Sequence, residues 1–218
     1  MNRGANSHAS DPAAHRDDPL VTGGLMNPAE HHARASEQFD ARVEEIRDDQ
    51  WAGPTPDGLW AVRDLVNHLV YGNRWVPEMV NGRTIEEIGD RFDGDLLGRD
   101  PKGAWKDSSR DAVGAFLEEA ALERTVHLSF GDVPCSEYAH QRGGDVLVHT
   151  WDLARAIGAD ESLPDDLCRS TLEYHLPYDE MLRGEGGLGP KLETPPGADV
   201  QTELLAFFGR RSQRDDGP

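Results

Sequence analysis

Two histidines and one aspartate are the residues whose types and spacing point most clearly to chemistry. His68 lies in DLVNHLV, and Asp145 and His149 lie in DVLVHTWDLARA. Both segments have the apolar pattern of packed helices. Residues four apart share one helix face, so we expect Asp145 and His149 side by side. If the helix with His68 packs against that face, one carboxylate and two imidazoles form a metal site with open coordination positions.

The same three residues also have a simpler interpretation. A single histidine on an apolar helix face is usually a hydrogen-bonded core residue, so His68 could pack apart from an Asp145–His149 pair. An aspartate buried beside a histidine still needs a partner, because an unpaired charge is costly to bury. A metal would satisfy all three groups at once.

Other polar side chains are candidates for supporting roles. Asp152 could orient His149 through a hydrogen bond, or it could pair with Arg155. His32 is expected to be either a substrate contact or an exposed neighbour of His31, and a role as a fourth metal ligand is the less favoured alternative.

Two tryptophans and two cysteines have weaker signals. Trp75 and Trp151 could wall a cavity near the metal, or they could be ordinary core residues. The spacing of Cys135 and Cys168 matches no zinc or redox motif, so we expect free thiols that are not nucleophiles.

The helices that must position these residues follow from apolar spacing and capping residues. Asn27-Pro28 begins a predicted helix over about 28–48, and a second helix over about 61–81 carries His68 and ends at Asn81-Gly82. The side chains expected to face inward are His32, Ser36, Phe39, Val43 and Ile46 in the first helix, and Leu65, His68, Leu69, Gly72 and Trp75 in the second.

A long irregular connection is expected over 83–106, followed by a third helix over about 107–121. The alternation in TVHLSF then predicts a short extended segment. The inward residues of the third helix are expected to be Val113, Phe116, Leu117 and Ala120.

A fourth helix over about 137–157 carries Asp145 and His149. It contains Gly143-Gly144, which is unfavourable inside a helix. Either the helix begins at Asp145, or these glycines permit close approach of another backbone.

Two further helices are predicted near the end, one over about 164–183 that Pro177 kinks or stops, and a short one in DVQTELLAFFG. The fold class is therefore all-α. Residues 25–160 are expected to form an antiparallel four-helix bundle, and 161–211 a C-terminal helical extension packed on it. Residues 1–24 are expected to be disordered and 212–218 a tail.

Charge and hydropathy exclude several classes of partner. Lys and Arg total 22 against 41 Asp and Glu, a formal net charge of -19, so nucleic acid and anionic membranes are not expected partners. The chain has neither an apolar run of ~20 residues nor an apolar signal segment after Met1. We expect a cytoplasmic protein.

Several segments together resemble the DinB / mycothiol-dependent maleylpyruvate isomerase N-terminal domain superfamily, and more narrowly its actinobacterial branch of metal-binding proteins. The resemblance runs from about Pro28 to Arg210. The segments that carry it are WAGPTP, WAVRDLVNHLVYGNRW, LERTVHLSFGDVP, DVLVHTWDLARAIGADESLP and LLAFFGRR.

The resemblance implies a DinB-like bundle with a divalent metal held by His68, Asp145 and His149. Many relatives have glutamate or a third histidine where Asp145 stands. Zinc is the first expectation for the metal, with nickel or another transition metal as alternatives.

The resemblance also implies a low-molecular-weight thiol such as mycothiol, whose metal-activated thiolate attacks an electrophilic substrate. The chain would then be a thiol-dependent transferase or isomerase of unknown substrate. The alternative is a non-catalytic metal-binding protein with a structural or sensing role. A homodimer is a further expectation. The chain looks too short for the isomerase's second domain, and that domain's arginine is not assigned to Arg210 or Arg211.

Overall fold

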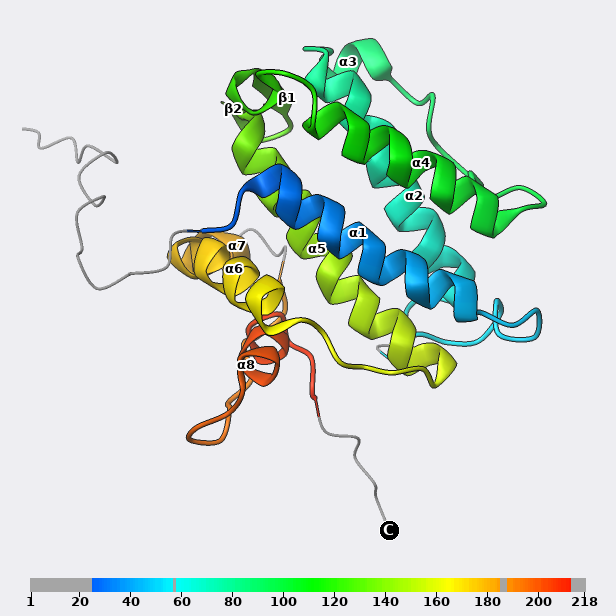
Figure 1. Cartoon of the computed structure of the whole chain (residues 1–218), viewed down its shortest axis with the longest axis vertical. Coiled ribbons are helices and arrows are strands. Elements are labelled where there is room, and N and C mark those ends of the chain that lie inside the picture. Colours follow the sequence, from blue (N-terminus) through cyan, green and yellow to red (C-terminus); the bar gives the residue numbers. More distant parts are fainter. Residues whose placement is uncertain (1–24, 57, 185–187, 213–218) are drawn as a thin grey trace, which may run out of the picture.

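Four long helices form a bundle in this computed structural model, which describes residues 25–56, 58–184 and 188–212 (Figure 1). The helices of the bundle are α1 (Pro28–Glu45), α2 (Val62–Val80), α4 (Pro101–Phe116) and α5 (Cys135–Ile157). The predicted all-α bundle is therefore confirmed. The tail predicted over 1–24, and all of the tail predicted over 212–218 except Ser212, lie outside the described residues.

The long connection between α2 and α4 sets the directions of the helices. Arg63 at the start of α2 bonds the carbonyl of Gly98 just before α4, and Arg74 pairs with Asp111 further along both helices, so α2 and α4 run parallel. On the other side, Lys106 of α4 pairs with Glu44 near the end of α1, so these two helices are antiparallel. One long crossover thus replaces the tight turn that would reverse the chain.

The segment predicted to be irregular contains two helical stretches. A short helix α3 (Ile85–Ile88) begins at Thr84, whose side chain accepts a hydrogen bond from the Glu87 amide. The helix α4 begins six residues before the predicted start, because Asp100 caps it by accepting from the Gly103 amide and Pro101 fits its first turn.

The predicted end of this third helix was also wrong, as were two of its four inward residues, whereas Phe116 is buried as predicted. The helix ends at Phe116. Leu117 is 61% exposed, and Ala120 has a positive φ of 56°, beyond the helix end. The apolar spacing continued past the last helical residue, so it assigned both side chains to a face that the chain had already left.

A β-hairpin follows, with β1 (Thr125–Leu128) pairing antiparallel to β2 (Gly131–Pro134) at one end of the bundle. The predicted extended segment is its first strand.

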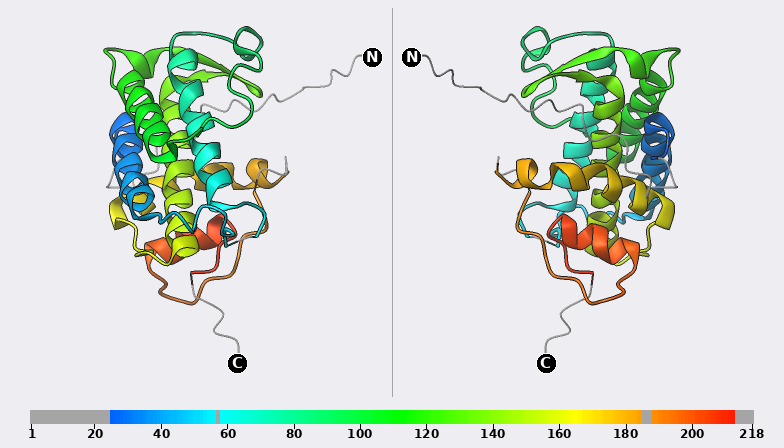
Figure 2. Two further views of the ribbon diagram at one scale, coloured as in Figure 1. Left: turned by 90° about the vertical axis from the view of Figure 1, so that its right-hand side faces the viewer. Right: turned by 90° about the vertical axis from the view of Figure 1, so that its left-hand side faces the viewer.

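The C-terminal helices are α6 (Asp165–His175), the 3-10 turn η2 (Leu176–Tyr178), α7 (Asp179–Gly184) and α8 (Val200–Phe207). The predicted break at Pro177 is confirmed by η2. Figure 2 shows α6, α7 and α8 crossing the direction of the bundle helices. Among the described residues, no helix is both long and apolar enough to cross a membrane.

Gly143 and Gly144 lie inside α5, which continues through both positions. A Cβ at Gly143 would overlap the buried imidazole of His31 from α1, and a Cβ at Gly144 would lie 2.7 Å from Cε1 of His175 from α6. The glycines therefore serve close packing of helices, and the alternative in which the helix begins at Asp145 is wrong.

Gly143→Ala should lower the free energy of unfolding by about 1–3 kcal/mol, because the added methyl group forces His31 out of its packed position. Gly114→Ala is the matched control, since an added Cβ there meets nothing within 4 Å in the exposed face of α4. That control should be neutral or stabilising by up to about 1 kcal/mol. Urea denaturation of both variants tests this, and equal effects would contradict close packing at Gly143.

Candidate metal site

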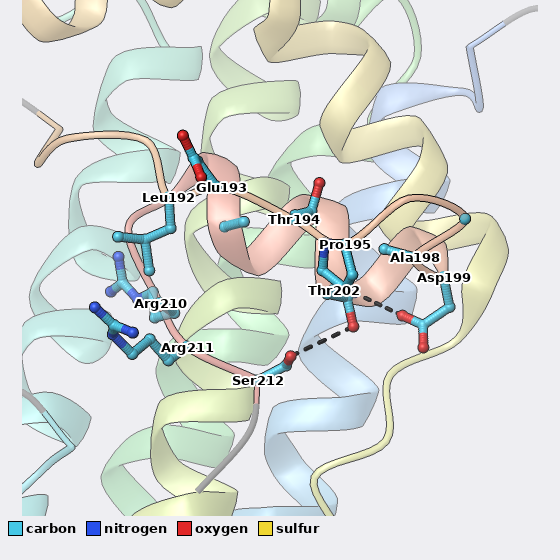
Figure 3. A pocket seen from close by; sticks show the side chains of 12 residues that line it. Leu192, Glu193, Thr194, Pro195, Ala198, Asp199, Thr202, Arg210, Arg211 and Ser212 are labelled. Atoms are coloured by element: carbon cyan, nitrogen blue, oxygen red, sulfur yellow. Dashed lines mark hydrogen bonds between the residues drawn. The ribbon is translucent and has the colours of Figure 1, made fainter. Parts of the chain in front are cut away.

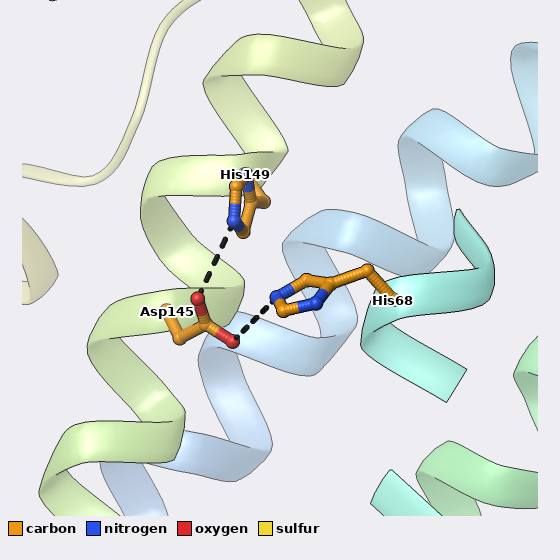
Figure 4. Close-up of side chains that lie close together, drawn as sticks. All are labelled: His68, Asp145 and His149. Atoms are coloured by element: carbon orange, nitrogen blue, oxygen red, sulfur yellow. Dashed lines mark ion pairs between the residues drawn. The ribbon is translucent and has the colours of Figure 1, made fainter. Parts of the chain in front are cut away.

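The structure brings His68 of α2 together with Asp145 and His149 of α5 (Figure 4). One ligand atom from each residue lies within 4.8 Å of the other two. Nε2 of His149 is 3.4 Å from Oδ1 of Asp145, and Nε2 of His68 is 3.5 Å from Oδ2. Two zinc ligands in a tetrahedral arrangement lie about 3.4 Å apart when each bond is about 2.1 Å. The donor set and its spacing therefore fit a divalent cation, and the alternative in which His68 packs separately is wrong.

Asp145 carries a negative charge that several neighbours compensate. Its side chain is 30% exposed, and Nη1 of Arg142 donates to Oδ2 over 2.6 Å. Burial by itself raises the pKa of the Asp145 carboxyl, but the charge of Arg142 and hydrogen bonds from His149 and His68 outweigh it and hold this pKa well below its usual range. The carboxylate is ionised at neutral pH.

Asp152 holds His149 from the side opposite Asp145. Its Oδ2 is 2.9 Å from Nδ1 of His149, and Arg210 forms two hydrogen bonds with the same carboxylate at 3.2 and 2.8 Å. The orienting role predicted for Asp152 agrees with this geometry, and the alternative pairing with Arg155 is wrong, because Arg155 pairs with Glu161. With Nδ1 engaged by Asp152, the remaining nitrogen of His149 is free to face a cation.

The two carboxylates also set the charge of His149. Burial lowers the pKa of this imidazole, but hydrogen bonds to Asp145 and Asp152 outweigh burial and raise the pKa to about 9. Hydrogen bonds from His149 and Arg210 likewise lower the pKa of Asp152, against the effect of its burial. In the metal-free protein the imidazole is therefore cationic at neutral pH.

Trp60 is the aromatic side chain that lies against both imidazoles. Its ring centroid is 4.9 Å from that of His68 and 5.8 Å from that of His149, and the residue is 37% exposed. Of the two interpretations given for Trp75 and Trp151, the structure supports ordinary packing residues, because Trp75 packs on Phe92 and Trp151 lies in the core. Trp60 lies before the cap of α2, which begins at Val62, so helical spacing does not place it and the sequence carried no signal for this contact.

His31 and His32 are both fully buried, so neither is an exposed neighbour of the other. Burial lowers the pKa of His31 to about 4 and that of His32 to about 3. His32 packs its ring edge on Phe116, 4.9 Å between centroids, and is not in the His68 cluster. The expectation of an exposed His32 is wrong because α1 meets α5 at Gly143, a contact that no local pattern in the sequence shows.

A pocket of about 660 Å³ lies beside α8 rather than at the His68 cluster (Figure 3). Arg210, Arg211 and Thr202 are among the residues that line it. Arg210 connects the two places, because it lines this pocket and also binds Asp152. The polar lining contains no second group of metal ligands among the described residues.

The sequence of this chain is similar to one known family and to two curated proteins. The family described as "Mycothiol maleylpyruvate isomerase N-terminal domain" matches residues 32–154, which include all three clustered residues. Two uncharacterized proteins of Mycobacterium tuberculosis, from strains CDC 1551 and H37Rv, are each 30% identical over 200 residues, 85% of this chain and 98% of the relative.

Two solved structures have a similar fold. They are the mycothiol-dependent maleylpyruvate isomerase, with a TM-score of 0.61, and a histidine-to-alanine mutant of a protein with that name, with a TM-score of 0.62. Each is 17% identical, and each alignment covers 85% of this chain and 89% of the other. The predicted lack of room for the rest of the isomerase fold is therefore wrong.

The stability of the metal-free protein should fall as pH rises from about 6.5 through about 9. The pKa of His149 is raised from 6.5 to about 9 on folding, so its contribution is complete below the unfolded value and is lost as the folded imidazole deprotonates. Asp152→Asn should flatten this part of the profile. Urea denaturation after chelator treatment measures it, with Asp132→Asn, beside the half-buried His127, as control. A profile that Asp152→Asn leaves unchanged would contradict the assignment.

Proposed function

Because the chain belongs to the mycothiol maleylpyruvate isomerase N-terminal domain family, we propose that it is a metal-dependent enzyme that uses a low-molecular-weight thiol. Its reaction is a transfer or an isomerisation of an electrophilic substrate. His68, Asp145 and His149 hold a divalent metal, with zinc as the first expectation. The observation that carries the proposal is the convergence of these three side chains within 4.8 Å.

An open site supports catalysis better than a structural clasp. A structural zinc site is normally closed by four protein ligands, whereas a catalytic site keeps a position for water or substrate. Among the described residues, the cluster has three possible protein ligands. His68 is 36% exposed at its side chain while its Nε2 is buried, so the cluster lies just beneath the surface.

A metal bound there would supply a positive charge that lowers the pKa of a coordinated thiol. The chain's own residues prepare the place for it. Asp152 fixes the orientation of His149 through Nδ1. Trp60 places an apolar ring against both imidazoles.

The thiol must come from outside the chain. Burial raises the pKa of Cys135 to about 11 and that of Cys168 to about 12, so both stay protonated at neutral pH. Neither cysteine belongs to the His68 cluster. A small thiol is therefore the available nucleophile, and mycothiol is the one that the family's description names.

Asp145→Ala should lower metal affinity by about 100-fold or more while helicity is retained, because it removes one of three ligands. Elemental analysis and circular dichroism of the purified variant measure the two properties. Asp132→Ala is the control, since Asp132 pairs with His127 in the hairpin and neither residue belongs to the His68 cluster. Full metal content in Asp145→Ala would rule out the proposed site.

Mycothiol added to cobalt-substituted protein should produce a thiolate-to-metal absorption band, because a thiolate replaces solvent at the open position. S-methylated mycothiol keeps the rest of the molecule but cannot form a thiolate, so it should give no band. If the two compounds give the same spectrum at millimolar concentration, thiol use at this site is wrong.

A further inference from the structure

The side chain of Arg142 packs closely between α5 and α2. Its side chain is 11% exposed, and its guanidinium lies directly on the backbone of Gly72, where an added Cβ would come within 2.5 Å of Cζ. Nη2 reaches Oδ1 of Asn73 at 3.5 Å, and the buried Nε has no hydrogen-bond partner among the described residues. Only glycine at position 72 leaves this space free.

The guanidinium points at the same carboxylate oxygen as His68. Nη1 of Arg142 is 2.6 Å from Oδ2 of Asp145, and Nε2 of His68 is 3.5 Å from that atom. A cation placed between the imidazoles and this carboxylate would meet the positive charge of Arg142 across the shared oxygen. Two positive charges this close repel each other strongly in a partly buried site.

We propose that Arg142 is a positioning residue that holds Asp145 when no metal is bound and competes with the metal for that carboxylate. This inference rests on the proposed metal site. Arg142 compensates the charge of Asp145 in the metal-free bundle, so the three ligands stay in place before a cation arrives. The same contact makes metal binding weaker than the three ligands alone would allow.

The two polar neighbours of the cluster, Asp152 and Arg142, therefore have opposite effects on the affinity for a metal. Asp152 accepts a hydrogen bond from His149 and makes that imidazole a better donor to a cation. Arg142 donates to Asp145 and draws electron density away from the ligand oxygen. A purely structural arginine would behave differently, because its loss would disorder Asp145 and weaken metal binding.

Arg142→Met tests the competition, since methionine keeps much of the length and loses the charge. Zinc affinity of the purified variant, measured by competition with a chromophoric chelator, should rise by about tenfold or more. The urea midpoint of the metal-free variant should fall, because Asp145 loses its counter-ion. Arg74→Met removes an equal charge from the Asp111 pair on the surface of α2, and its zinc affinity should stay within about twofold of wild type.

Gly72→Ala tests the same contact without removing a charge. The new methyl group displaces the guanidinium from α2, so zinc affinity should rise here too, and Gly114→Ala controls for the general effect of alanine in a helix. This variant keeps the proposal testable if Arg142→Met does not fold.

The outcomes separate this inference from the function it rests on. Wild-type protein that binds no zinc would overturn the metal site and the competition together. Wild-type protein that binds one zinc per chain, with affinity unchanged or lowered in the folded Arg142 or Gly72 variants, would overturn the competition alone.

Discussion

The negative charge of one carboxylate, that of Asp145, must be compensated, and the rest of the site depends on this constraint. Asp145 lies between two helices with 30% of its side chain exposed, where an unpaired charge is unfavourable. The groups around it, His68, His149 and Arg142, are all hydrogen-bond donors or cations. The same arrangement that stabilises the carboxylate also collects two imidazole nitrogens on one side of it. Charge compensation and the geometry of the proposed metal site are thus two results of one packing arrangement.

The C-terminal segment takes part in this arrangement as well as covering the bundle. Arg210 follows α8 and forms two hydrogen bonds with Asp152, which in turn binds Nδ1 of His149. The orientation of the His149 imidazole therefore depends on a residue 58 positions after Asp152 in the chain. A truncated bundle would lack this connection, because the Asp152 carboxylate would lose Arg210, one of its two cationic partners.

Small residues permit the close approach of helices that the site requires. Gly143 admits the imidazole of His31 from α1, and Gly72 admits the guanidinium of Arg142 from α5. Glycine lowers the helix propensity of both segments. In return, the glycines let α1 and α2 each approach α5 closely enough for polar side chains to meet inside the bundle.

Local periodicity in the sequence determined the helical fold class, the long connection and the shared face of Asp145 and His149, because spacing along one helix fixes what lies on one side of it. The matched motifs also pointed to His68 as their partner. Only the tertiary structure decided that Arg142, Trp60 and Arg210 surround these residues and that His32 does not. Those contacts join helices far apart in the chain, and their closeness depends on crossing positions and on glycines at contact points, which no local pattern encodes.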